Sequence, residues 1–310
     1  MSESTRLKVL ASAQELGYVM NNLAQAMVGA GHRSLALVTS SLEPSWVSDL
    51  ATGAQDTAAK NAHPFLLALT HGDAKREQQI FASLIEQRVA AVLMTDSAGA
   101  EGPSEEKLAT YASALASVGA VLVMCGYQFF PTMPQILTVN CDQVGGVRQA
   151  VQHLTSKGHR RIAFLGWNRT TTAGQRFLGY SLGMRDAGMA IDPALVIECT
   201  DDAVEAHLKS ALLLKSTSPP TAIVCFTDNT ARGVYRAARD FAIIVPLQIA
   251  IVGFDDSPTA TDLTPGLTTV SAPYVDLGAR AASVALRLVD ENQNPELPTE
   301  LIIRGSTTSE

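Results

Sequence analysis

The run Ile249-Ala-Ile-Val-Gly-Phe-Asp-Asp256 is an apolar segment that ends abruptly in two adjacent carboxylates. A loop rich in proline, glycine and threonine follows it, and this loop leads into a second short strand that ends at Val270. In an open α/β sheet, ligands bind beyond the carboxyl ends of the strands, so an acid at such an end is a candidate ligand contact. The competing interpretation is an acidic, solvated loop after a core strand. The run therefore predicts an α/β sheet with Asp255 as a candidate ligand contact at its edge.

The same alternation extends over most of the chain. Apolar runs predict strands at residues 35–39, 65–70, 91–95, 121–125, 136–140, 161–166, 195–198, 222–226 and 249–253. Helical patterns lie between most of them, for example at residues 172–188, 202–214 and 229–241. Continuous apolar strands separated by helices indicate parallel sheets covered on both faces. Two such series in tandem predict two similar lobes, each a doubly wound α/β sheet.

The end of the chain adds one helix and one strand more than the second lobe needs, at residues 275–289 and 300–304. We infer that the chain crosses back between the lobes near its end. The expected division is residues 1–32 as a helical N-terminal segment, residues 33–158 plus about 272–290 as the first lobe, and residues 159–271 plus about 291–310 as the second.

Bulk composition fits this division. The chain has 310 residues, of which 46% are hydrophobic and 17% charged, as expected of a folded protein with two domain-sized lobes. Its net charge of −7 gives no general attraction to nucleic acid, so any DNA contact must come from a local element. There is no signal peptide and no apolar run of the roughly 20 residues that span a bilayer, which predicts a cytoplasmic protein without a membrane partner.

No cofactor or metal is expected. The four cysteines are far apart and the six histidines do not cluster at metal-binding spacing, so the thiols are expected to be reduced core residues. Neither a dinucleotide-binding nor a phosphate-binding glycine motif follows a strand. The sequence Gly179-Tyr-Ser-Leu-Gly183 fits a hydrolase pattern that requires a strand before the serine, but it lies within a predicted helix. Ser181 is therefore expected to be an ordinary helix residue and the chain not to be an enzyme, with a Ser181 hydrolase as the rival hypothesis.

Several blocks resemble the lactose-repressor/galactose-repressor (LacI-type) family of transcription regulators. They include Val9-Leu-Ala-Ser-Ala-Gln-Glu-Leu-Gly-Tyr18, Leu154-Thr-Ser-Lys-Gly-His-Arg-Arg-Ile-Ala-Phe-Leu-Gly166, the aspartate-ending run quoted first, Leu267-Thr-Thr-Val270 and Leu301-Ile-Ile-Arg304. Their order across nearly the whole chain makes the resemblance specific. It implies a periplasmic-binding-protein-like fold of type I, a homodimer, a small effector such as a sugar bound between the lobes, and operator DNA as a partner.

The N-terminal segment departs from the family. Residues 5–16 predict a helix and residues 21–28 a second short one that needs a partner to be stable. Family members carry two further helices before these, one of which reads bases in the major groove. Met20 stands where the family commonly has proline, and Met27 where a leucine wedge enters the minor groove. The resemblance implies DNA contacts from Tyr18, Asn21, Ala24, Gln25 and Met27. The alternatives are an unbound segment and a ligand sensor that no longer binds DNA.

Positions at the carboxyl ends of strands, together with the resemblance, predict the effector contacts. They are Ser40, Ser41, Trp46 and Asp96 in the first lobe and Thr172, Arg176, Thr227, Asp228 and Asp255 in the second. Carboxylates accept hydroxyl hydrogen bonds, a guanidinium donates in a fixed fork, and an aromatic ring covers an apolar sugar face. Asp228 could instead cap a helix, and Trp46 could pack in the core. Where the family often has an acid after the fourth strand, this chain reads Val123-Met-Cys-Gly126, and a polar position after Val270 reads Ser271-Ala272. The site therefore looks less polar than one for a simple hexose, and a nucleoside, a modified sugar or another small metabolite stays open.

Overall fold

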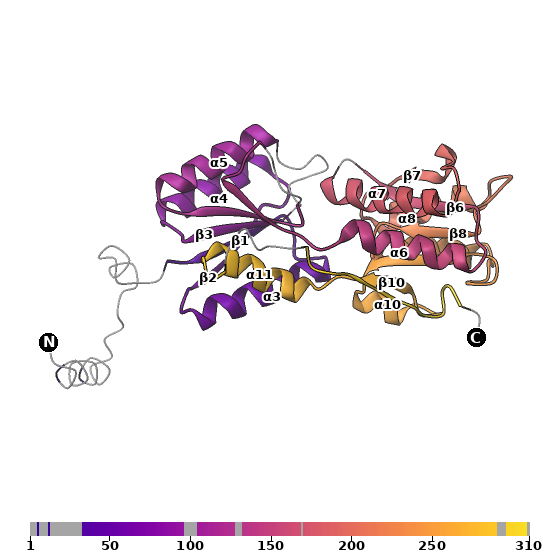
Figure 1. The fold of residues 1–310 in the computed structure, drawn as a ribbon. Coiled ribbons are helices and arrows are strands. Elements are labelled where there is room, and N and C mark those ends of the chain that lie inside the picture. The colour runs from indigo at the N-terminus through magenta and orange to yellow at the C-terminus, as the bar shows by residue number, and fades with distance from the viewer. Residues whose placement is uncertain are drawn as a thin grey trace.

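The computed structural model describes residues 33–95, 104–127, 132–168, 170–289 and 296–308, together with Thr5 and Ser12. Six of the residues nominated above lie outside the described residues: Tyr18, Asn21, Ala24, Gln25, Met27 and Asp96. The described chain forms two α/β lobes side by side, the first built around residues 35–139 and the second around residues 143–271 (Figure 1).

The first lobe is built on a parallel five-stranded sheet with the order β2-β1-β3-β4-β5. Its strands are β1 (Leu35–Thr39), β2 (Phe65–Leu69), β3 (Ala91–Thr95), β4 (Val121–Cys125) and β5 (Ile136–Val139). One face is covered by α3 (Ser45–Lys60) and α11 (Tyr274–Ala285), and the other by α4 (Ala74–Glu86) and α5 (Glu105–Ser117). Because both faces of the sheet are covered, β1 and β3 are buried along their whole length and are apolar up to the threonine that ends each strand.

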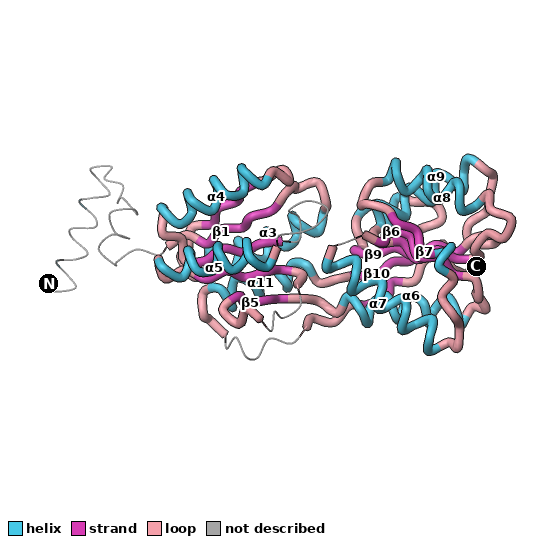
Figure 2. The backbone as a smooth tube through the Cα atoms, turned by 90° about the horizontal axis from the view of Figure 1, so that it is seen from above, coloured by secondary structure: helices cyan, strands magenta, loops and turns pink. Residues whose placement is uncertain are grey.

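The second lobe has a six-stranded sheet with the order β11-β10-β9-β8-β6-β7. Its strands are β6 (Ile162–Trp167), β7 (Val196–Glu198), β8 (Ala222–Cys225), β9 (Ala250–Asp255), β10 (Thr268–Ser271) and β11 (Glu300–Ile302). The sheet lies between α6 (Gln143–Ser156) with α7 (Thr171–Asp186) and α8 (Ala203–Leu214) with α9 (Asp228–Asp240) (Figure 2). Two short helical segments, η1 (Pro193–Leu195) and α10 (Pro258–Asp262), complete the lobe.

The fold class expected from the sequence is confirmed, with one departure at the edge of the second sheet. β11 runs antiparallel to β10, whereas the other pairings in this sheet are parallel. The reason is topological: β11 enters the sheet from the cleft side, where the parallel strands end, so it runs against them.

The chain passes between the lobes more than once. After β5 it enters the second lobe at α6, and after β10 it returns to the first as α11, which packs on α3 (Figure 1). It then comes back to the second sheet as β11. Two of these connections lie side by side, since Cys141 forms a bridge with Leu297 and the Asp142 N–H donates to the Leu297 carbonyl over 2.8 Å. The cleft between the lobes is therefore bordered by adjacent connecting strands.

The contact between α3 and α11 requires glycine on both helices. A Cβ added at Gly278 would lie 1.9 Å from the Leu50 carbonyl oxygen, and one at Gly53 would lie 1.8 Å from that of Val275. We expect Gly278→Ala to lower the free energy of unfolding by about 2–3 kcal/mol, because the two helix backbones must move apart. Urea denaturation measures this change. The matched control is Gly174→Ala in α7, where an added Cβ meets nothing within 4 Å and should be neutral or stabilising. Equal losses in the two variants would contradict the prediction.

Candidate functional site

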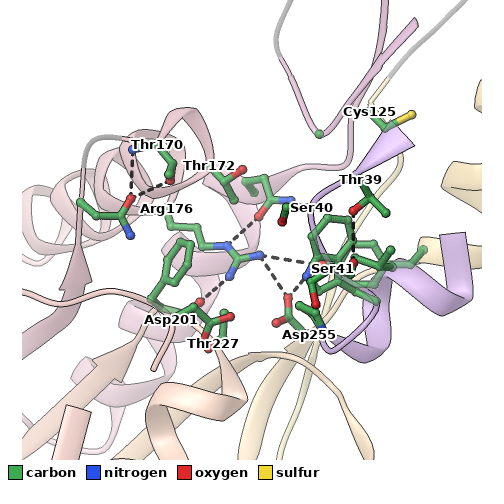
Figure 3. Close-up of a pocket in the computed structure, with 18 of the residues that line it drawn as sticks. Thr39, Ser40, Ser41, Cys125, Thr170, Thr172, Arg176, Asp201, Thr227 and Asp255 are labelled. Atoms are coloured by element: carbon green, nitrogen blue, oxygen red, sulfur yellow. Dashed lines mark hydrogen bonds and ion pairs between the residues drawn. The ribbon is translucent and has the colours of Figure 1, made fainter. Parts of the chain in front are cut away.

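A cavity of about 340 Å³ lies between the carboxyl ends of the two sheets (Figure 3). The first lobe contributes the last residues of β1 and β4, residues that follow these strands, and residues near the starts of α3 and α11. The second contributes residues that follow β6, β7 and β8, the last residue of β9, and the first residue of α6. The lining residues are Thr39, Ser40, Ser41, Pro44, Trp46, Val47, Cys125, Gly126, Gln143, Asn168, Thr170, Thr172, Arg176, Thr200, Asp201, Phe226, Thr227, Asp255, Tyr274 and Leu277.

Arg176 lies on α7, which begins after β6, and its side chain is almost fully buried. Its Nε donates to Gln143 Oε1 over 2.8 Å, Nη1 donates to the Phe226 carbonyl, and Nη2 reaches Asp255 Oδ1 over 3.1 Å. The guanidinium carbon also lies 3.7 Å from the ring centroid of Phe254, a cation–π contact. These contacts fix the guanidinium in one orientation at the base of the cavity.

Asp255 is the last residue of β9 and the ion-pair partner of Arg176. Its φ of 105° lies in the region that favours glycine, so the backbone is strained where it turns the side chain into the cleft. The hydroxyl of Tyr274 donates to the same Oδ1 over 2.6 Å. Burial raises the pKa of Asp255 to about 6, against the opposing effects of Arg176 and the Tyr274 hydrogen bond.

Asp228 lies behind the cavity wall rather than on it. Oδ2 accepts hydrogen bonds from the Ser257 N–H (2.7 Å) and Oγ (3.0 Å), and Oδ1 accepts one from Thr269 Oγ1. Its neighbour Thr227 lines the cavity and is the residue that caps α9. Burial, followed by the nearby Asp255 carboxylate, raises the pKa of Asp228 to about 7. The carboxylate thus connects α9 to the loop after β9 and to β10, and it does not face the cleft.

The other nominated residues within the described part of the chain lie on the cavity. These are Ser40, Ser41, Trp46, Thr172, Arg176, Thr227 and Asp255. The Trp46 ring is partly exposed and lies 5.5 Å from the Tyr274 ring, so it forms part of the first-lobe wall. The structure therefore brings these side chains together from both lobes (Figure 3).

Seven polar lining residues were not nominated from the sequence: Thr39, Gln143, Asn168, Thr170, Thr200, Asp201 and Tyr274. Asp201 follows β7, and its Oδ1 accepts a hydrogen bond from Thr227 Oγ1, so the same strand-end rule would have found it. Tyr274 and Gln143 lie where the chain crosses between the lobes. Their approach to Arg176 depends on how the lobes pack, and no local pattern reveals it.

The features that would suggest other chemistry have structural roles here. Ser181 lies inside α7, and its hydroxyl donates to the Phe177 carbonyl over 2.8 Å. All four cysteines are buried free thiols, as expected. Among the described residues, no group of histidine, cysteine and acidic side chains could hold a metal ion, and no helix has the length and apolar character to cross a membrane.

Comparison with known proteins agrees with this architecture. Residues 151–307 match the family described as periplasmic binding protein-like domain. The HTH-type transcriptional regulator DegA of Bacillus subtilis (strain 168) is 31% identical over 99% of this chain and 90% of its own length. The transcriptional regulator CelR, solved as a cellobiose complex, superposes with a TM-score of 0.77 at 26% identity, covering 99% of this chain and 91% of that one.

The fold also matches a lac repressor dimer bound to operator and the anti-inducer ONPF. The TM-score is 0.84 at 23% identity, covering 100% of this chain and 92% of that one. These relatives are transcription regulators and not enzymes. On the 31% identity to DegA over nearly its whole length, the chain belongs to the LacI family of transcription regulators.

Proposed function

We propose that a small polar metabolite binds in the cavity between the lobes and thereby changes the affinity of this regulator for operator DNA. In this proposal the protein acts in the cytoplasm as a homodimer. The observation that carries the proposal is the buried Arg176–Asp255 pair, which lies at the base of a cavity to which both lobes contribute. A ligand that touches both lobes alters their relative position, and that change is what a DNA-binding segment could respond to.

The contacts at the base of the cavity favour an uncharged ligand with hydroxyl groups. The guanidinium of Arg176 already donates to Gln143, Phe226 and Asp255, so its part is to orient the site rather than to bind an anion. Asp255 uses Oδ1 for Arg176 and Tyr274, which leaves Oδ2 outside those bonds to accept from a ligand hydroxyl. Trp46 and Phe226 offer rings to the apolar face of a sugar or to a base.

The ligand is tested by thermal unfolding of the protein against cellobiose, common monosaccharides and nucleosides. A true effector at 100 times its Kd stabilises the folded state by about 2.7 kcal/mol. We expect Asp255→Asn to abolish the shift, because the substitution replaces one acceptor oxygen by an NH2 donor and removes the charge that holds Arg176. Asp262→Asn, an exposed acid in α10, is the control and should keep it. A full shift retained in Asp255→Asn would contradict this assignment.

The DNA partner is tested by gel retardation of DNA from upstream of the protein's own gene. Retardation that changes on addition of the stabilising ligand supports the proposal. Phosphate contacts are strongest at low salt. If the protein does not retard the DNA even there, the alternative that it is a ligand sensor without DNA binding is the one that remains.

A further inference from the structure

Arg33 lies at the end of the first lobe opposite the cleft, immediately before β1. Its side chain donates to four main-chain carbonyls. Nε bonds to Arg88, Nη2 to Val89 and to Val118 (2.8 Å), and Nη1 to Gly119 (3.1 Å). We call these four oxygens the Arg33 carbonyl cluster. A planar guanidinium can serve them together because its N–H donors point in several fixed directions.

The four carbonyls of the cluster come from two helix ends that have the same backbone geometry. Arg88 follows α4 and Gly119 follows α5, with φ values of 52° and 71°. In both turns the next N–H bonds back over five residues, from Val89 to Leu84 and from Ala120 to Leu115. A helix carries partial negative charge at its carboxyl end, where carbonyls lack helical partners. Arg33 supplies a positive charge and hydrogen bonds to both ends at once.

The main-chain carbonyls of Arg33 and Ser34 also form contacts at this end of the first lobe. The carbonyl of Arg33 lies 2.6 Å from His63 Nδ1, and the carbonyl of Ser34 accepts from the Ala90 N–H over 2.7 Å. β1 begins one residue later and ends at Thr39, so Ser40 and Ser41 on the cavity are joined to Arg33 by a single buried strand. One end of this strand therefore belongs to the cleft and the other to the carbonyl cluster.

We propose that Arg33 is a positioning residue, which anchors the point where residues 1–32 join the first lobe and couples that point through β1 to the cleft. The anchoring is a property of the described contacts. The coupling rests on the function proposed above, together with the expectation from the sequence that residues 1–32 contribute DNA contacts.

Limited digestion with trypsin tests the anchoring in the full chain. Trypsin must take the arginine side chain into its own pocket, so the bound guanidinium protects the bond between Arg33 and Ser34. Arg33→Lys keeps the charge and a cleavable bond, but an ammonium cannot reach four carbonyls in two turns. We expect cleavage after residue 33 to be at least about tenfold faster in this variant, detected as a fragment beginning at Ser34.

The matched control is Arg88→Lys, since Arg88 contributes its carbonyl and not its side chain to the cluster. It should be cleaved after Arg33 as slowly as the wild type. Equal rates in the wild type and Arg33→Lys overturn the anchoring. Faster cleavage at every site, for example also after Lys60 and Arg148, shows general unfolding and overturns it as well.

Gel retardation with the same upstream DNA, with and without the stabilising ligand, tests the coupling. We expect Arg33→Lys to reduce the ligand-induced change in DNA affinity at least about fivefold while Arg88→Lys does not. An unchanged ligand response in a variant with faster cleavage overturns the positioning role. If the wild type itself does not retard the DNA, the proposed function and the coupling both fail, and the digestion still decides the anchoring.

Discussion

Replacing Arg176 with alanine should lower the free energy of unfolding by about 3–5 kcal/mol. The substitution leaves the Asp255 carboxylate, whose side chain is only 8% exposed, without its ion-pair partner. It also leaves Gln143 Oε1 and the Phe226 carbonyl without their donor and opens space beside Phe254. Urea denaturation monitored by circular dichroism measures the loss.

The double variant Arg176→Met with Asp255→Asn distinguishes charge from packing. Methionine keeps most of the apolar volume, and asparagine removes the buried charge, so most of the stability should return. If Arg176→Ala alone costs less than about 1 kcal/mol, the pair is not buried as described. If the double variant is as unstable as the single one, hydrogen bonding and packing outweigh the charge.

Asp228 should make a contribution to the stability of the folded state that falls as the pH rises from about 4 to about 7. Its pKa is raised from the usual 3.8 to about 7, so the folded state holds this proton more tightly than the unfolded state. The stabilisation is complete below pH 4 and is lost as the pH rises through 7, a change of about 2–4 kcal/mol. Asp255, with a pKa of about 6, adds to the same slope.

Asp228→Asn should remove the Asp228 part of this pH dependence. The stability of the variant relative to the wild type should therefore increase from pH 4 to pH 7.5. Denaturation at a series of pH values measures it. Asp192→Asn is the control of opposite sign, because hydrogen bonds from the Ala194 N–H and Arg161 lower the pKa of Asp192. In the wild type, ionised Asp192 stabilises the folded state above pH 4, and this stabilisation is lost as the pH falls below 4. Parallel pH profiles for wild type and Asp228→Asn would refute the assignment.

The strands and the position of Asp255 could be predicted from the sequence because both are local. A strand buried on both faces needs a continuous apolar run, and the acid that ends such a run must lie at a sheet edge. The same local pattern pointed to Thr227 and Asp228 alike. Thr227 lines the cavity, whereas the Asp228 side chain points away from it, because Gly253 has no side chain. A Cβ at Gly253 would lie 2.2 Å from Asp228 Oδ1, so its absence leaves room for the carboxylate to turn back toward β10.

The surroundings of Arg176 could not be predicted in this way. Gln143 and Tyr274 stand 33 positions before it and 98 positions after it, and both are placed by the crossings between the lobes. Arg33 is a similar case. Nothing in the sequence around it indicates that two distant helices end beside it, because that meeting is fixed by the order of β1, β3 and β4 in the sheet.

The late position of α11 in the chain has a consequence for biosynthesis. On the ribosome the strands of the first sheet emerge long before residues 274–285, so the face beside α3 stays partly uncovered while most of the second lobe is translated. Released chains that end before residue 274 should therefore expose apolar surface to chaperones and proteases, and the full chain should not. For the same reason, neither lobe can be produced as one uninterrupted fragment.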